Sequence, residues 1–149
     1  AVLSRVCGSG RDRRWCVPEK DWEGEVKAIF DAFKDPASPI GVRYVRDNIH
    51  RDGYTSAEKI LRIRAEDCDG IATALCALLG SVGYSTKLRP ISAKGSGGAA
   101  THVYCVAGIP AGPPERVEKW IPLDPTVSGK PFGWEAPDSL VEWRRDFLV

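Results

Sequence analysis

The sequence predicts an α+β domain in which helices come first and an antiparallel sheet follows. Apolar residues recur every three or four positions over residues 21–33, and residues 68–80 form a run that is apolar on most faces, so both segments are expected to be helices. Between residues 87 and 123 the apolar residues instead alternate with polar ones, which is typical of strands. Because the two patterns are segregated along the chain, the α+β class is favoured.

Length and composition indicate one globular domain. The chain has 149 residues, of which 43% are hydrophobic and 28% are charged. A domain of this size can bury a stable core without disulfides or a bound metal. Its 21 basic and 20 acidic side chains nearly cancel, so charge gives no reason to expect nucleic-acid binding. No apolar stretch approaches the roughly 18 residues that span a bilayer, so no membrane association is expected. We expect a basic arm over residues 1–18 and a single domain over 19–149.

The first predicted helix begins near Asp21 and ends before Asp35-Pro36, because a proline disfavours helical backbone at the residue before it. Its apolar face consists of Trp22, Val26, Ile29, Phe30 and Phe33. An extended segment over residues 40–45, a turn at Asp52-Gly53 and a brief helix from Ser56 are predicted to follow.

The second predicted helix is buried and carries a cysteine in its first turn. Asp67 is a suitable N-cap, the helix starts at Cys68, and Gly80 and Gly83 are expected to end it. Strands are then predicted over 87–91, 101–107 and 118–123.

The C-terminal part is predicted to finish with a helix. A loop over residues 125–137 is expected to lead to Asp138, which caps a last short helix containing Leu140, Val141 and Trp143.

The cysteines cannot all pair within the chain, because their number is odd. They are Cys7, Cys16, Cys68, Cys76 and Cys105. None has CxxC spacing and there are only two histidines, so neither a redox motif nor a zinc site is supported, and we expect no metal and no cofactor. Cys7 and Cys16 either close a small loop or remain thiols, whereas Cys76 and Cys105 are expected to be small buried side chains.

Cys68, His102 and Asp124 are the residues best suited to chemistry. A helix N-terminus favours a thiolate and its N–H groups can stabilise an oxyanion. The negative charges of Glu66, Asp67 and Asp69 oppose this, because they favour the neutral thiol. If the last two predicted strands pair about a turn centred near residue 113, His102 stands directly opposite Asp124. A carboxylate that orients an imidazole beside a thiol fits acyl transfer through a thioester.

The alternation of side chains predicts which residues accompany this pair. Tyr104, Val106 and Trp120 are expected on the face of the sheet that carries His102, and Cys105 on the other. His50, which lies in a charged turn, remains an alternative base.

Four segments resemble the transglutaminase-like superfamily: residues 66–72, 78–84, 101–104 and 120–126. The block Trp-Ile-Pro-Leu-Asp-Pro over residues 120–125 is the most specific of them. The resemblance implies a papain-like α+β fold in which Cys68 is the nucleophile, His102 the general base and acid, and Asp124 the residue that orients His102. The chain is similar to small stand-alone prokaryotic or phage-borne members of the superfamily, although Glu66 and Gly70 depart from the superfamily's sequence pattern.

Around these three residues we expect substrate or oxyanion contacts from Asn48, Asp69, Tyr104 and Trp120, together with the backbone N–H of Cys68. Trp120 fits a cleft wall and a core position equally well. The acidic residues near Cys68 favour substrates that carry Lys or Arg beside the reactive amide.

The sequence therefore predicts a cysteine-dependent enzyme acting on a peptide or protein amide. Hydrolysis, as in a peptidase or deamidase, is favoured over cross-linking, because water is always available as the acceptor. A location in the cytoplasm or in a virion is favoured over secretion. The alternative is a non-catalytic scaffold or interaction module with the same fold in a larger assembly.

Overall fold

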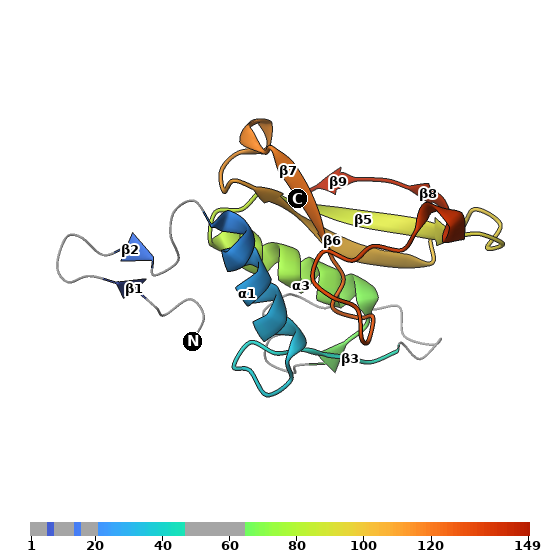
Figure 1. Cartoon of the computed structure of the whole chain (residues 1–149). Coiled ribbons are helices and arrows are strands. Elements are labelled where there is room, and N and C mark those ends of the chain that lie inside the picture. The colour runs from blue at the N-terminus through green and yellow to red at the C-terminus, as the bar shows by residue number, and fades with distance from the viewer. Residues whose placement is uncertain (1–5, 8–13, 16–20, 47–64) are drawn as a thin grey trace.

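The computed structural model describes residues 6–7, 14–15, 21–46 and 65–149 of the chain (Figure 1). The predicted turn at Asp52-Gly53, the predicted helix from Ser56, and the candidates Asn48 and His50 lie outside these residues, as does Cys16 of the possible N-terminal cysteine pair. Near the N-terminus, β1 (Val6–Cys7) and β2 (Arg14–Trp15) form a short antiparallel pair.

Helix α1 (Trp22–Lys34) confirms the first predicted helix. The side chain of Asp21 accepts a hydrogen bond from the N–H of Gly24 at 2.9 Å, which satisfies a donor that the first helical turn leaves open. The apolar face is buried at every one of the predicted positions apart from Trp22, which is partly buried.

Helix α3 (Cys68–Ser81) confirms the second predicted helix. Its N-cap is Asp67, and Gly83 follows its end with a φ of +100°, in the left-handed region where a residue without a Cβ is least strained. The helix buries residues on several faces: Ile71, Ala72, Ala74, Leu75, Cys76 and Leu79. Neither helix in the described part of the chain is long and apolar enough to span a membrane.

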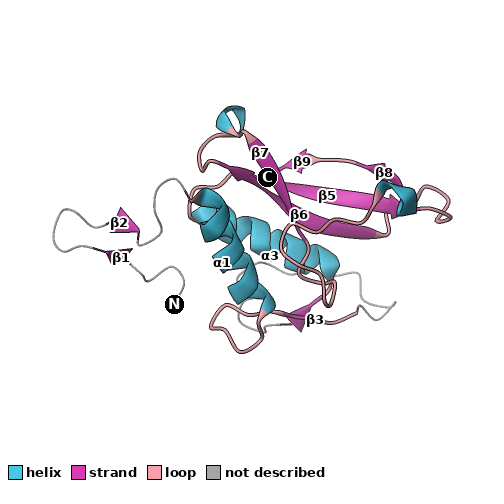
Figure 2. Ribbon diagram, in the orientation of Figure 1, coloured by secondary structure: helices cyan, strands magenta, loops and turns pink. Residues whose placement is uncertain are grey.

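The main sheet contains β5 (Thr86–Ala93), β6 (His102–Ile109), β7 (Lys119–Leu123), β8 (Val141–Arg144) and β9 (Phe147–Leu148). Its strands are antiparallel in the order β7-β6-β5-β8, and β9 pairs with another part of β5. Single-turn 3-10 helices, η2 (Pro114–Arg116) and η3 (Asp138–Leu140), precede β7 and β8. The α+β class is therefore confirmed (Figure 2).

Both helices lie on the same side of this sheet (Figures 1 and 2). The main core combines their apolar faces with side chains such as Cys105, Ala107 and Leu123, which point from β6 and β7 toward the helices. A smaller cluster formed by Ile91, Tyr104, Val106 and Val141, with Trp120 packed against it, has the opposite parity along β6. The predicted alternation along β6 and β7 is thus confirmed.

The predicted C-terminal helix is wrong. Only Asp138–Leu140 form a helical turn, and Val141 and Trp143 belong to β8, where they pair with Ala93 and Ser92 of β5. Spacing alone fits either structure here, and the free edge of β5 decides between them because it offers hydrogen-bond partners that a helix could not use.

A short parallel pair precedes α3. β3 (Arg43–Tyr44) pairs with β4 (Ala65–Glu66), so that Arg43 stands beside Ala65 and Tyr44 beside Glu66. This pair confirms an extended segment within residues 40–45 and ends two residues before Cys68.

Candidate functional site

Cys68 is the first residue of α3, and its side chain is a partly exposed free thiol. The Asp67 cap holds this turn in place: its carboxylate accepts the N–H of Gly70 at 3.1 Å, and its carbonyl accepts the N–H of Ile71 at 3.0 Å. The sulfur therefore lies at the positive end of a 14-residue helix, where a negative charge is stabilised.

His102 and Asp124 form a close pair at neighbouring strand ends. His102 begins β6 and Asp124 follows the last residue of β7, and His102 Nε2 lies 2.7 Å from Asp124 Oδ2. The Asp124 side chain is 4% exposed and the His102 side chain 24%. A nearly buried carboxylate thus faces a ring that is about a quarter exposed.

The predicted register of the β6–β7 hairpin is wrong by two residues. Cys105 pairs with Leu123 and Val106 with Pro122, so the same register continued past β7 would bring Thr126, not Asp124, opposite His102. A displacement of two residues leaves every side chain on its original face, because side chains alternate with a period of two. His102 and Asp124 therefore still meet, as diagonal neighbours.

Thr126 holds the second oxygen of the same carboxylate. Its hydroxyl donates to Asp124 Oδ1 at 2.6 Å and its backbone N–H donates to that oxygen at 3.1 Å. Thr126 Oγ1 also lies 3.5 Å from His102 Nε2. No role of Thr126 was predicted from the sequence, although an Asp whose side chain bonds the backbone two residues later is a recognisable turn pattern.

The contacts of His102 raise its pKa to about 9. Burial by itself lowers this pKa, but the hydrogen bonds to Asp124 and Cys68 and the charges of both partners outweigh it. Because Nε2 faces Asp124, the ring nitrogen left for Cys68 is Nδ1. Both partners therefore favour the imidazolium form.

The pKa of Asp124 is lowered by the same pair. Burial would raise it, but the hydrogen bond and charge of His102, together with the donors of Thr126, more than compensate. Near neutral pH the arrangement is a carboxylate, an imidazolium and a sulfur in sequence, which can store a proton on the ring and release it to a neighbouring group.

Tyr104 stands beside the imidazole on the same face of β6. Its ring centroid lies 6.0 Å from that of His102, its side chain is buried, and its hydroxyl donates to Glu135. Burial, together with this hydrogen bond, raises the pKa of Tyr104. Tyr104 thus lies next to the imidazole and is itself held by Glu135.

Trp120 and Asp69 have other surroundings. Trp120 is half-buried on the same face, four residues before Asp124, with the Lys87 ammonium 3.9 Å from its ring centroid. Asp69 is exposed in the first turn of α3, where its carbonyl accepts the hydroxyl of Thr73. Asp69 therefore remains positioned to influence approach to Cys68, whereas Trp120 packs against the smaller cluster.

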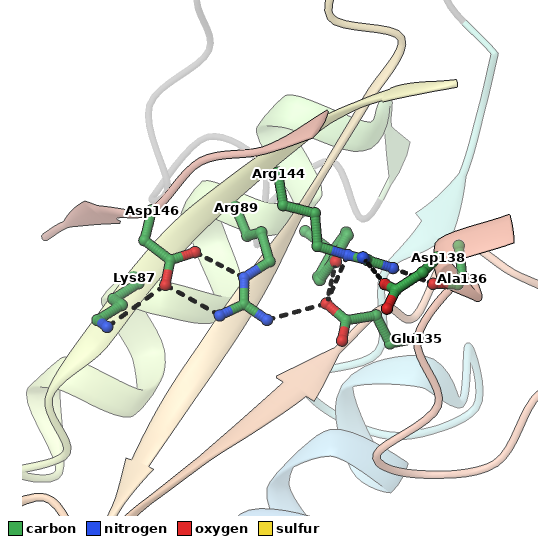
Figure 3. A network of polar contacts seen from close by, with 8 residues as sticks. Lys87, Arg89, Glu135, Ala136, Asp138, Arg144 and Asp146 are labelled. Atoms are coloured by element: carbon green, nitrogen blue, oxygen red, sulfur yellow. Dashed lines mark hydrogen bonds and ion pairs between the residues drawn. The ribbon is translucent and has the colours of Figure 1, made fainter. Parts of the chain in front are cut away.

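A charged network continues from Tyr104 across the outer face of the sheet (Figure 3). Glu135 accepts from Tyr104 and, at 2.9 Å, from Arg89, which also holds Asp146 through two nitrogens at 2.6 and 2.9 Å. Arg144 lies beside Glu135 and bonds Asp138 and the carbonyl of Ala136. Tyr104, which lies next to His102, is thus linked through Glu135 to Arg89 of β5 and to Arg144 of β8.

The described residues contain no group of three or more His, Cys, Asp and Glu side chains arranged to hold a metal ion. Comparison of the chain with protein-family models, with curated proteins and with solved structures gives no match.

Proposed function

We propose that this protein is a thiol hydrolase with a transglutaminase-like, papain-type arrangement, which cleaves a peptide or protein amide through a thioester on Cys68. The observation that carries the proposal is the 2.7 Å contact between His102 Nε2 and Asp124 Oδ2. A hydrogen bond to Cys68 also contributes to the raised pKa of His102. The location of the thiol at a helix N-terminus and of its partners at strand ends supports the same assignment.

The first half of the reaction transfers the acyl group to sulfur. His102 holds the proton of Cys68, and the thiolate attacks the amide carbonyl, whose oxygen becomes negative. N–H groups of the first turn of α3 are suited to stabilise this oxygen. The C–N bond then breaks, the departing nitrogen takes the proton from His102, and a thioester remains on Cys68.

The second half returns the enzyme to its starting state. His102, now neutral, accepts a proton from water, and the oxygen of that water attacks the thioester carbonyl. The C–S bond breaks to give a carboxylic acid and the Cys68–His102 pair. Asp124 stays ionised throughout and keeps Nε2 engaged, so that Nδ1 faces the sulfur at each proton transfer.

The proposal is tested by the pH dependence of Cys68 alkylation with iodoacetamide, followed by peptide mapping so that the other cysteines are counted separately. At about pH 6, an isolated thiol with a pKa near 8.5 is almost wholly protonated, whereas a thiolate paired with imidazolium reacts. We expect Cys68 to be alkylated at this pH and His102→Ala to slow the reaction at least about tenfold.

Lys27→Ala, which alters an exposed ion pair on α1, serves as the matched control and should leave the rate unchanged. If Cys68 behaves as an ordinary thiol in the unaltered chain and His102→Ala makes no difference, the catalytic assignment fails and a scaffold role takes its place.

A further inference from the structure

Two cysteines that the proposed reaction does not use face each other in the core. Cys76 of α3 and Cys105 of β6 are 1% and 0% exposed, and their sulfur atoms lie 2.9 Å apart. Both are thiols in this structure. Cys76 Sγ also lies 3.5 Å from the carbonyl oxygen of Lys87, on the neighbouring strand.

The two sulfur atoms would have to move only a short distance to form a covalent bond. A disulfide joins its sulfurs at about 2.05 Å, so the two atoms need to approach by only about 0.9 Å. Both cysteines belong to one buried core cluster, in which the small side chains of Ala74 and Ala107 are also included. An approach of this size is within reach of side-chain rotation and does not require helix and sheet to separate.

We propose that Cys76 and Cys105 are a disulfide site, oxidised by a small-molecule disulfide such as oxidised glutathione while the chain folds. One cysteine sulfur attacks the oxidant, whose S–S bond breaks to release one glutathione thiolate and leave a mixed disulfide. The second cysteine, after losing its proton, attacks that mixed disulfide and displaces the other glutathione. The protein loses two protons and two electrons, and the oxidant is reduced to two thiols.

The exchange belongs to the folding stage, because both sulfurs are covered once the core has formed. In the folded protein the contact with Cys105 lowers the pKa of Cys76, whereas burial raises the pKa of Cys105. These folded-state shifts do not act on the open chain, so either cysteine can attack the oxidant first.

The bond would join the two elements that begin at Cys68 and His102, namely α3 and β6. It would close a loop of about 30 residues, which restricts the unfolded chain and stabilises the folded one. The inference does not depend on the proposed reaction, because neither sulfur belongs to the candidate site.

The test refolds the full chain in a mixture of oxidised and reduced glutathione, and in parallel with dithiothreitol. Remaining thiols are alkylated under denaturing conditions before digestion with trypsin. We expect the oxidised sample to yield peptides 65–87 and 95–116 joined, two hydrogen atoms lighter than their sum. Further cleavage before Asp69 separates Cys68 from Cys76 and should leave the cross-link on the fragment that begins at Asp69.

The oxidised protein should also melt higher than the reduced protein, by on the order of 10 °C. Cys76→Ala provides the matched control, in which neither the cross-link nor the difference in Tm should occur. The proposal is overturned if Cys76 and Cys105 are both alkylated after oxidative refolding, if Cys105 is joined to Cys68, or if the cross-linked protein melts lower. The peptide map of the unaltered chain decides the matter even if the variant does not fold.

Discussion

Thr126 donates both its hydroxyl and its backbone N–H to Asp124 Oδ1, at 2.6 and 3.1 Å, and so fixes the carboxylate whose other oxygen meets His102. This relationship makes Thr126 a positioning residue: it acts on the imidazole through the orientation and charge of Asp124. Several consequences can be measured without knowing the natural substrate.

Thr126→Val should raise the pKa of Asp124, because the variant keeps the branched shape but removes one hydrogen-bond donor. A hydrogen bond to a charged group contributes about 1.5–3 kcal/mol, which corresponds to about one to two pKa units. The acid limb of the Cys68 alkylation profile should move to higher pH by that amount. Thr126→Ser retains the hydroxyl and should restore the original profile; equal profiles for the Val variant and the unaltered chain would contradict the role.

Asp124→Asn should lower the pKa of His102 from about 9, because the ring loses the charge that offsets its burial. NMR titration of the imidazole resonances measures this directly, and the chain has only two histidines, so His50→Ala identifies the second signal. We expect a fall of at least about one unit, equivalent to about 1.4 kcal/mol. Asp31→Asn, which removes an exposed carboxylate on α1, should leave the His102 titration unchanged.

The stability of the fold should depend on pH through the same pair. The pKa of His102 is higher folded than unfolded, so its contribution is fully present below about pH 6.5 and is lost as the pH rises through about 9. The pKa of Asp124 is lower folded than unfolded, so its contribution is present above about pH 4 and is lost as the pH falls through the folded value.

The contribution of this pair to the free energy of unfolding, measured with urea, should therefore be largest between about pH 4 and about pH 6.5. His102→Ala isolates that contribution from those of other groups: the difference in free energy of unfolding between the unaltered chain and the variant should shrink toward about pH 9.5. A difference that stays constant over this range would show that the ring is not protonated preferentially in the folded state.

Arg89→Met should destabilise the protein by about 1–3 kcal/mol, because it leaves Glu135 and Asp146 without the guanidinium that joins them. The Arg89 side chain is only 17% exposed, so its ion pairs are less screened than surface pairs. Lys27→Met breaks a pair whose side chains are 55% and 51% exposed and should cost less than about 0.5 kcal/mol. Urea unfolding of both variants measures the contrast, and equal losses would refute it.

Substrate charge provides a further prediction that rests on the proposed function. Peptides with Lys beside the reactive amide should be cleaved several-fold faster than matched peptides with an uncharged residue of the same length, because Asp69 lies exposed in the turn that begins with Cys68. Asp69→Asn should reduce that ratio while the uncharged peptide reacts at its former rate. A ratio near one in the unaltered protein would exclude this preference.

The helices and the central strands could be predicted from the sequence because their patterns are local. The periodic burial of α1 and the capped start of α3 at Cys68 are determined within a few turns of chain. β8 could not be predicted in the same way, since Val141 and Trp143 are strand residues only because β5 offers an open edge. Tertiary pairing there outweighs local spacing.

For the candidate site, the sequence predicted the face of the sheet on which His102 and Asp124 lie but not the register of the strands that carry them. Alternation was enough to place His102 and Asp124 on one side of the sheet, whereas the pairing depends on how the chain turns through η2 between β6 and β7. Glu135 was missed because it reaches Tyr104 from a loop 31 residues later, and no local pattern reports such a contact. Whether Asn48 contributes an oxyanion donor stays a prediction.

The parallel pairing of β3 with β4 has a consequence for how this protein could be altered. The ladder fixes Arg43 beside Ala65 and Tyr44 beside Glu66, so the intervening chain leaves and re-enters the described fold at one anchored point, two residues before Cys68. A proline at Arg43 or Tyr44 would remove a backbone N–H from this ladder and should therefore disturb the segment that leads into Cys68, although both positions lie far from the thiol in the sequence.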